Sequence, residues 1–141
     1  MKNQIALLSD NQEIQGAIAS YYPSIELFRS IESIKRENLS ILLTDFEIFG
    51  STDSIQFLLS KIRKKIQDKP VLLILRDKSI TELHMDWFFD DFIIFPLKRE
   101  ELYARINRIL WQKGIDDDTI AIGRLIINIK EYSVYMENEK L

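Results

Sequence analysis

The residues that could carry catalytic or metal chemistry are few in this chain. Cysteine is absent, which excludes disulfides, thiolate nucleophiles and thiolate metal sites. His84 is the only histidine and lies in the stretch ITELHMDWFF, so the sequence does not indicate a histidine metal site. No serine, histidine and aspartate form a plausible catalytic array, and no glycine-rich phosphate loop follows an apolar run. These observations argue against a nucleotide-binding or nucleophilic enzyme.

Polar residues at the ends of apolar runs are the remaining candidates for a site. Asp45 closes the run SILLTD (40–45), and Ser9 and Asp10 come at the end of QIALLS (4–9). In open parallel sheets, function gathers at the carboxyl ends of the strands. By the same rule we single out the residues that end two later runs: Leu75, Arg76, Phe95 and Pro96. The simplest roles are structural, with Asp10 capping the helix that follows and Asp45 capping its loop.

Short β-rich runs alternate with longer amphipathic segments over residues 3–113. The runs that predict strands are 4–9, 24–28, 40–45, 71–76 and 92–95. The segments that predict helices are 10–22, 30–38, 51–67, 79–89 and 98–113, with Ser51 as a cap of the third. Five strands interleaved with five helices imply parallel pairing through right-handed crossovers. We therefore expect an α/β fold with a three-layer, doubly wound, five-stranded parallel sheet.

Composition and charge limit the classes of partner. The 141 residues include 19 basic and 22 acidic side chains, for a net charge of −3, so there is no basic surplus to support nucleic-acid binding by this piece alone. No apolar run is long enough to span a membrane, and the start MKNQIALLSDNQEIQ is too polar for a signal peptide. We expect a cytoplasmic protein without membrane contact.

The pattern changes after residue 113. Residues 1–113 form the predicted α/β domain, and residues 114–118 (GIDDD) read as a short acidic linker. Residues 119–141 alternate apolar and polar side chains, which predicts antiparallel strands. A strand segment of this length cannot build a core of its own. We expect it to be the start of a second domain, of which the rest lies beyond residue 141; packing on the first domain is the alternative.

Residues 3 to about 113 resemble the CheY-like receiver domain of bacterial two-component response regulators. ILLTDFEIFG is similar to the third strand and loop of that family, PVLLILRD to its fourth strand, and DDFIIFPLKREELYARI to its fifth strand and helix. The tail IAIGRLIINIKEYSVYMENEKL is similar to the first strands of the OmpR/PhoB-type winged-helix DNA-binding domain. The resemblance implies the flavodoxin/CheY-like strand order 2-1-3-4-5, a cis peptide bond before Pro96, and Asp45 as phosphoacceptor.

The site that the resemblance implies is degenerate in this chain. The family's acidic pair is Ser9–Asp10 here, its hydroxyl position is Leu75 and its lysine position is Phe95. Phe92 occupies the position of the switch aromatic. The ligands left for Mg²⁺ are Asp10, Asp45 and, as an added carboxylate, Glu47. Two donors to a phosphoryl group are missing, so the substitutions predict an atypical receiver that requires no cofactor, with Mg²⁺ as an optional ion.

The resemblance also implies a dimer. In the OmpR/PhoB family the fourth helix, fifth strand and fifth helix form a two-fold interface of salt bridges. The residues at matching positions are Asp90, Asp91, Glu101, Tyr103 and Arg105. Asp91 could pair with Arg105 of a partner. Because exposed pairs contribute little, the interface would depend on Trp87, Phe88 or Tyr103 as well.

We interpret the chain as the regulatory domain of a DNA-binding transcriptional regulator that dimerises without depending on phosphorylation. Its expected partners are a second copy of the chain, promoter DNA through the missing part of the winged-helix domain, and a histidine kinase. One alternative is an ordinary response regulator whose Asp45 is phosphorylated in order to signal. Another is a small flavodoxin-like binding protein, which bound flavin would reveal.

Overall fold

The computed structural model describes residues 4–37, 39–50, 55–84, 86–114, 119–122 and 125–128. The chain divides into two units, one of residues 2–97 and one of residues 98–141 together with Met1. The strands and helices of the first unit are β1 (Ile5–Leu8), α1 (Gln12–Tyr21), β2 (Glu26–Phe28), β3 (Ile41–Asp45), α2 (Ile55–Ile66), β4 (Val71–Leu75) and β5 (Asp91–Ile94). The described residues of this unit also include three 3₁₀ segments: η1 (Ile31–Ser33), η2 (Phe46–Phe49) and η4 (Asp77–Glu82).

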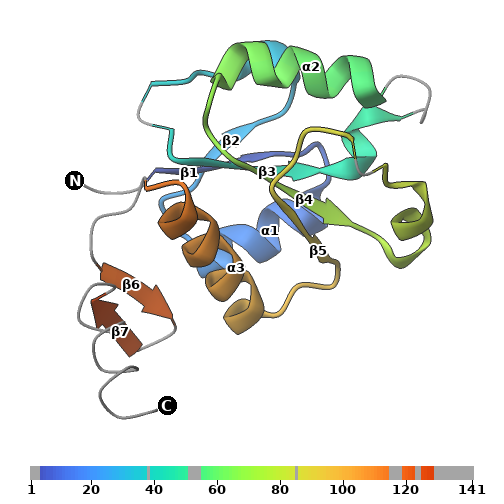
Figure 1. The fold of residues 1–141 in the computed structure, drawn as a ribbon. Helices are drawn as coiled ribbons and strands as arrows, with labels where there is room; N and C mark the ends of the chain where they lie inside the picture. Colours follow the sequence, from blue (N-terminus) through green and yellow to red (C-terminus); the bar gives the residue numbers. More distant parts are fainter. Residues whose placement is uncertain are drawn as a thin grey trace. The chain divides into compact units, whose positions relative to one another are not determined.

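The five strands of the first unit form one parallel sheet in the order β2-β1-β3-β4-β5, as predicted (Figure 1). β3 and β4 are buried along their whole length, which explains their nearly continuous apolar sequences. Hydrogen bonds extend the pairing beyond the strands, since the Phe95 N–H donates to the Leu75 carbonyl at 2.8 Å. The peptide bond between Phe95 and Pro96 is cis, as expected.

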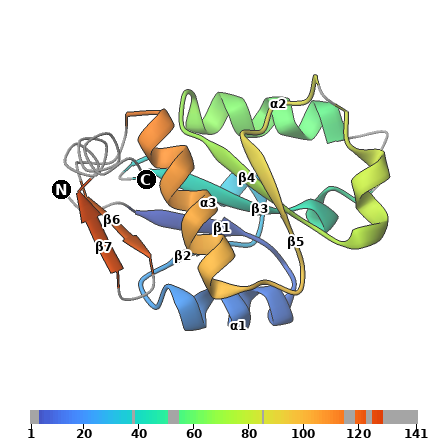
Figure 2. The ribbon, with the colours of Figure 1, turned by 60° about the horizontal axis from the view of Figure 1, so that its bottom comes forward.

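Two helices cover opposite faces of this sheet, α2 on one side and α1 on the other (Figures 1 and 2). Successive side chains of a strand point to opposite faces. The α2 side holds a cluster that includes Leu8, Leu42 and Leu73 from the strands and Leu59 and Ile62 from the helix. The first unit thus has the layers of a doubly wound sheet.

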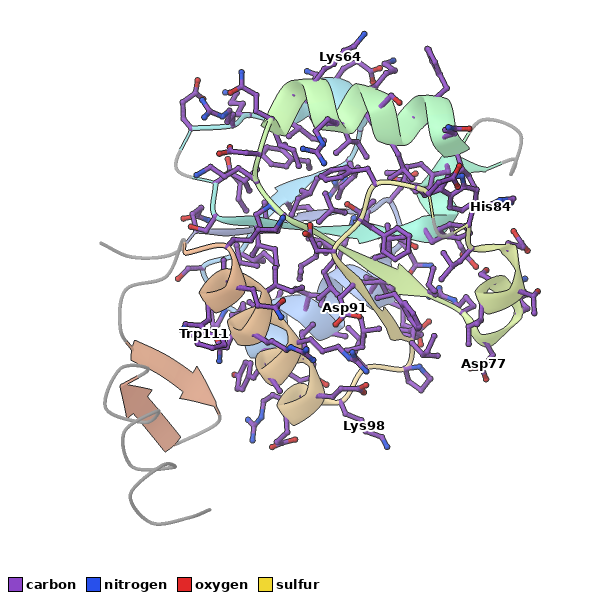
Figure 3. The ribbon with its side chains drawn as sticks, viewed as in Figure 1. Lys64, Asp77, His84, Asp91, Lys98 and Trp111 are labelled. Carbon is purple, nitrogen blue, oxygen red and sulfur yellow. The ribbon has the colours of Figure 1, made fainter. Side chains whose placement is uncertain are left out.

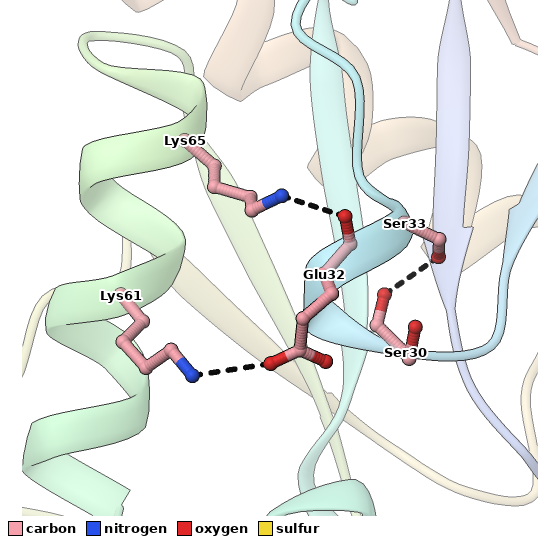
Figure 4. A network of polar contacts seen from close by, with 5 residues as sticks. All are labelled: Ser30, Glu32, Ser33, Lys61 and Lys65. Carbon is pink, nitrogen blue, oxygen red and sulfur yellow. Dashed lines mark hydrogen bonds and ion pairs between the residues drawn. The ribbon is translucent and has the colours of Figure 1, made fainter.

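The segment 30–38 is not the α-helix that its sequence suggested; it contains only the single 3₁₀ turn η1. Its two buried apolar side chains, Ile31 and Ile34, lie three residues apart. That spacing suits a 3₁₀ turn, and no further apolar residue continues an α-helical face. Lysines of α2 hold the turn from outside, because Lys61 Nζ pairs with the Glu32 carboxylate at 3.1 Å and Lys65 Nζ donates to its carbonyl at 2.6 Å (Figure 4).

The predicted helix over 79–89 is also wrong. The structure has the 3₁₀ segment η4 there, followed by turns. Trp87, Phe88 and Phe89 are each half-buried against the core cluster. Three consecutive side chains of an α-helix cannot all share one face, so burying this aromatic triplet is incompatible with a helix lying flat on the core. The guanidinium of Arg63 stacks on the Phe88 ring at 3.3 Å and covers it.

The first helix is capped by Asn11, not by Asp10 as predicted. The Asn11 side chain accepts a hydrogen bond from the Ile14 N–H at 2.9 Å, while Asp10 is exposed. The predicted cap Ser51 lies outside the described residues. Gly50 ends the η2 turn with a φ of 70°, a conformation that favours glycine.

The second unit contains α3 (Arg99–Gln112) and the antiparallel pair β6 (Thr119–Ile122) and β7 (Leu125–Asn128). Lys98 and Trp111 mark the two ends of α3 in Figure 3. The antiparallel pairing agrees with the expectation for residues 119–128, and the domain boundaries at 113 and 118 stay predictions. No helix among the described residues is long and apolar enough to cross a membrane.

Candidate functional site

The carboxyl ends of four parallel strands place the predicted site residues at one edge of the sheet. Asp45 is the last residue of β3 and Leu75 the last of β4, while Ser9 follows β1 and Phe95 follows β5. Parallel registers align Asp45 with Ile74 and Leu75 with Ile94. The structure therefore brings these four residues to the same end of the sheet, as expected for parallel strands.

Asp45 is almost completely enclosed, with 2% of its surface exposed. One carboxylate oxygen, Oδ2, accepts a hydrogen bond from the Ser9 hydroxyl at 2.9 Å. The other, Oδ1, accepts from the Glu47 N–H at 3.1 Å, so Asp45 caps η2. The structural role predicted for Asp45 is thus present, and both of its oxygens are already engaged by protein donors.

Ser9 is buried and joins Asp45 to the start of α1. Its hydroxyl oxygen accepts a hydrogen bond from the Asn11 N–H at 3.1 Å, and its O–H donates one to Asp45 Oδ2. From the sequence, Ser9 counted only as a lost carboxylate. The structure shows instead that it supplies a hydrogen-bond donor to the buried Asp45 carboxylate.

The pKa of Asp45 is raised above its ordinary value, and burial is the main cause. The hydrogen bonds from the Ser9 hydroxyl and the Glu47 N–H and the charge of Arg76 act in the opposite direction, while the Glu47 carboxylate raises the pKa further. The protein environment therefore opposes a negative charge on Asp45. A phosphoryl group, with more charge, would meet the same desolvation.

Arg76 is the residue of this edge whose role the sequence did not reveal. Its Nε lies 3.6 Å from Oε2 of Glu47, and its guanidinium carbon lies 4.6 Å from the centre of the Phe95 ring. Its Nη1 is buried and has no hydrogen-bond acceptor among the described residues. The available signal was its position directly after β4, at the functional edge of the sheet.

The residues present do not fit the Mg²⁺ ion that the family resemblance implies. Asp10 and Glu47 are exposed while Asp45 is enclosed and hydrogen-bonded by Ser9. Within the described ranges, no group of three or more histidine, aspartate or glutamate side chains converges so as to hold a metal ion. Mg²⁺ prefers several oxygen ligands arranged around one point, and the structure does not provide this arrangement.

The other predicted residues have these surroundings. Leu75 is fully buried in the core cluster, and Phe92 is half-buried against it. His84 is exposed beside η4, with its ring 4.7 Å from that of Trp87 (Figure 3). The hydroxyl and charge that a phosphoryl group would use are absent at Leu75 and Phe95.

The residues predicted at the dimer interface all have contacts within the chain. Asp90 and Val71 bond twice, since the Asp90 carboxylate accepts the Val71 N–H and its own N–H donates to the Val71 carbonyl, each at 2.8 Å. Asp91 Oδ1 accepts the Phe92 N–H at 2.8 Å. On α3, Arg105 forms an ion pair with Glu101 at 3.1 Å, and Tyr103 is half-buried.

Comparisons with known proteins agree with the fold. No family model matches the chain. The transcriptional regulatory protein BasR of Escherichia coli (strain K12) is 27% identical over 113 residues, which cover 78% of this chain and 50% of BasR. The chain thus spans about half the length of this curated relative.

Solved structures share the architecture at lower identity. A crystal structure of NtrX from Brucella abortus has a TM-score of 0.69 at 21% identity and covers 82% of this chain and 28% of that one. The NtrX receiver domain alone has a TM-score of 0.64 at 20% identity, over 77% of this chain and 98% of that one. An adenylate cyclase structure from Rhodopirellula baltica has the same TM-score of 0.64 at 15% identity, over 82% of this chain and 92% of that one.

At these identities the structures show the fold alone. This chain has the strand order expected from the sequence, and Asp45 lies at the end of β3. The chain therefore has the doubly wound fold of a CheY-like receiver domain.

Proposed function

We propose that this chain is the regulatory domain of a DNA-binding transcriptional regulator and that it works as a dimerisation module without requiring phosphorylation. The relative BasR is described as a transcriptional regulatory protein, which supports a role in gene regulation. A regulatory rather than catalytic role also agrees with the absence of cysteine and of a second histidine. We place the protein in the cytoplasm, where such regulators meet DNA.

One observation carries the proposal: both oxygens of Asp45 are held by protein donors inside an enclosed site. Leu75 and Phe95 provide neither the hydroxyl nor the lysine charge through which a phosphoryl group would act. Moving a two-state balance from 1:99 to 99:1 needs about 5.5 kcal/mol of differential affinity. Charge-assisted hydrogen bonds contribute about 1.5–3 kcal/mol each, so losing two of them removes most of that difference.

The proposed interface comprises Asp90, Asp91, Glu101, Tyr103 and Arg105. In the OmpR/PhoB family a fourth helix also belongs to this interface. In this chain η4 and the aromatic residues 87–89 occupy that part of the sequence. Within this interface we expect Asp90 to keep its bond to the Val71 N–H. An intermolecular pair of Asp91 with Arg105 would have to compete with the pair that Arg105 forms with Glu101. Apolar contacts of Trp87 or Tyr103 would then supply most of the stabilisation.

The test is sedimentation equilibrium of the full chain with and without beryllofluoride and Mg²⁺, which together mimic a phosphoryl group. We expect the same monomer–dimer constant in both conditions. A tightening of about tenfold with beryllofluoride that disappears in Asp45→Ala would mean that the chain signals through phosphorylation, which is the alternative function.

Charge reversals test the interface. Arg105→Glu should weaken self-association, and adding Asp91→Arg should partly restore it. Arg108→Glu is the matched control, because Arg108 is an exposed arginine of the same helix outside the proposed face. If Arg105→Glu dimerises like the wild type and like Arg108→Glu, the proposed face is not the interface.

Promoter DNA and a histidine kinase are the further partners that we propose for the whole regulator. The antiparallel pair β6–β7 supports assigning residues 119–141 to the start of a winged-helix domain. We expect this chain alone not to bind DNA in a sequence-selective way, since its charge balance is acidic. A gel-shift assay with promoter and scrambled duplexes tests this, and selective binding by the 141-residue chain would contradict it.

A further inference from the structure

Two carboxylates, Asp45 and Glu47, lie two residues apart at the carboxyl edge of the sheet. The cationic side chain of Arg76 interacts with both. Arg76 directly follows β4, and its Nε lies 3.6 Å from the Glu47 carboxylate. Its charge also acts on Asp45. The described part of the chain brings no cluster of acidic side chains together for a metal ion at this edge.

Arg76 is held in place by more than its ion pair. Its guanidinium lies over the ring of Phe95, 4.6 Å from the ring centre, and about a fifth (21%) of its side chain is exposed. The strand pairing fixes this contact, because the Phe95 N–H donates to the carbonyl of Leu75, the residue before Arg76. A flat, delocalised cation stacks on an aromatic face in a way that a lysine ammonium does not.

We propose that Arg76 is the resident cation of this site and that its fixed charge, seated on Phe95, excludes divalent cations from the Asp45–Glu47 carboxylates. Phe95 carries no charge of its own but positions one from the neighbouring strand. The positive charge of the site is then a permanent part of the fold and does not depend on ion concentration.

The buried Nη1 supports this role. It is buried and has no acceptor among the described residues, so no hydrogen bond offsets its share of the positive charge. A divalent ion entering beside Asp45 would be repelled by the guanidinium charge, which acts on Asp45. It would also have to displace the Ser9 hydroxyl from Asp45 Oδ2, which is bonded at 2.9 Å.

The experiment is a Mn²⁺ titration of the full chain by calorimetry, with NMR line broadening of the Asp45 and Phe46 amides to locate the ion. We expect wild type to show no broadening that is specific to these amides. Arg76→Ala and Arg76→Gln should each bind Mn²⁺ at least about tenfold more tightly, with broadening centred on Asp45. Arg76→Gln keeps the aliphatic stem and ends in a planar polar group, which guards against a loss of folding in Arg76→Ala.

Two controls distinguish the effect of the Arg76 charge from the effect of its placement on the Phe95 ring. Arg36→Ala removes an equal charge from the exposed pair with Asp68 and should leave Mn²⁺ binding unchanged. Phe95→Leu removes the ring under Arg76 and should raise Mn²⁺ affinity by less than Arg76→Gln does. Wild type that binds Mn²⁺ at Asp45 as tightly as the variants would overturn the proposal, as would Arg76 variants that bind no more tightly than wild type. This titration is independent of the dimer, so it can fail while the proposed function holds, and the reverse.

Discussion

Two buried hydroxyl groups, one bonded to Asp45 and one on the residue before it in β3, allow a sharp prediction. Ser9→Ala removes the hydroxyl that donates to Asp45, and Thr44→Val removes a hydroxyl one residue before Asp45. Both side chains are completely buried, with 0% exposure. They differ in one respect: the Ser9 hydroxyl bonds to Asp45 at 2.9 Å, while Thr44 Oγ1 has no hydrogen-bond partner among the described residues.

The magnitude for Ser9→Ala follows from the bonds that are lost. A hydrogen bond to a charged group contributes about 1.5–3 kcal/mol. The Asn11 N–H also loses its acceptor at 3.1 Å, but it is only partly buried and water can replace the bond. We expect the free energy of unfolding at about pH 7 to fall by about 2–3 kcal/mol. Thr44→Val keeps the shape and removes an unpaired polar atom, so its unfolding free energy should be unchanged or higher by about 1 kcal/mol.

The loss in Ser9→Ala should depend on pH. Burial raises the pKa of Asp45 in the folded state, so its carboxyl group favours folding below its ordinary pKa of 3.8, and that contribution is lost as the pH rises through the folded value. The Ser9 hydroxyl lowers the pKa of Asp45, and without it the folded pKa rises further. The difference between wild type and Ser9→Ala should therefore be largest near neutral pH and smaller at about pH 4.

Urea denaturation of the three proteins at both pH values provides the measurement. Equal effects of Ser9→Ala and Thr44→Val at neutral pH would refute the reasoning, because one hydroxyl is bonded to a buried carboxylate and the other is unpaired. A loss in Ser9→Ala that does not change with pH would show that the effect comes from packing and not from the Asp45 charge.

Three further predictions concern the framework of the site. Asp90→Ala should lower the unfolding free energy by about 1–2 kcal/mol, because the carboxylate binds the Val71 N–H at 2.8 Å, and a normal sedimentation profile would show that the loss is structural. Ile62→Ala should cost about 2–5 kcal/mol in urea denaturation, since Ile62 is completely buried in α2; a loss under about 1 kcal/mol would contradict the core described above. Glu32→Ala should shift the denaturation midpoint far less than Ile62→Ala, and the shift should vanish at high salt, as expected for its exposed pair with Lys61; an equal shift at high salt would contradict this.

The sheet could be predicted because its strands are long apolar runs with clear ends. β3 and β4 are buried on both faces, so almost every residue in them is apolar and the strands are visible as continuous apolar runs. The two helices that were predicted wrongly, over 30–38 and 79–89, are short segments whose conformation is determined by tertiary contacts. Ile31 and Ile34 fit one turn as well as a helix, and the aromatic residues 87–89 take their positions from the core, not from helical periodicity.

The site could be predicted in position but not in chemistry. Parallel strands fix where Asp45, Leu75 and Phe95 lie, and the sequence supplies their types. The hydrogen bond from Ser9 to Asp45 and the stacking of Arg76 on Phe95 depend on side-chain direction across strands. No local sequence pattern encodes such directions. The sequence therefore indicated only that Ser9 replaces a carboxylate, and it assigned no function to Arg76. The choice of Asn11 over Asp10 as cap has the same origin, since either residue type fits that position.

The two outer strands of the sheet have a consequence for how copies of this chain can meet. β2 has three residues and β5 has four, and each begins with an acidic side chain, Glu26 or Asp91. Short, charged outer strands offer few free backbone groups for a strand of another molecule to pair with. Copies are thereby kept from joining sheet to sheet, a route that leads to open-ended aggregates. We therefore expect the proposed dimer to form through side chains, where geometry can limit it to a closed pair.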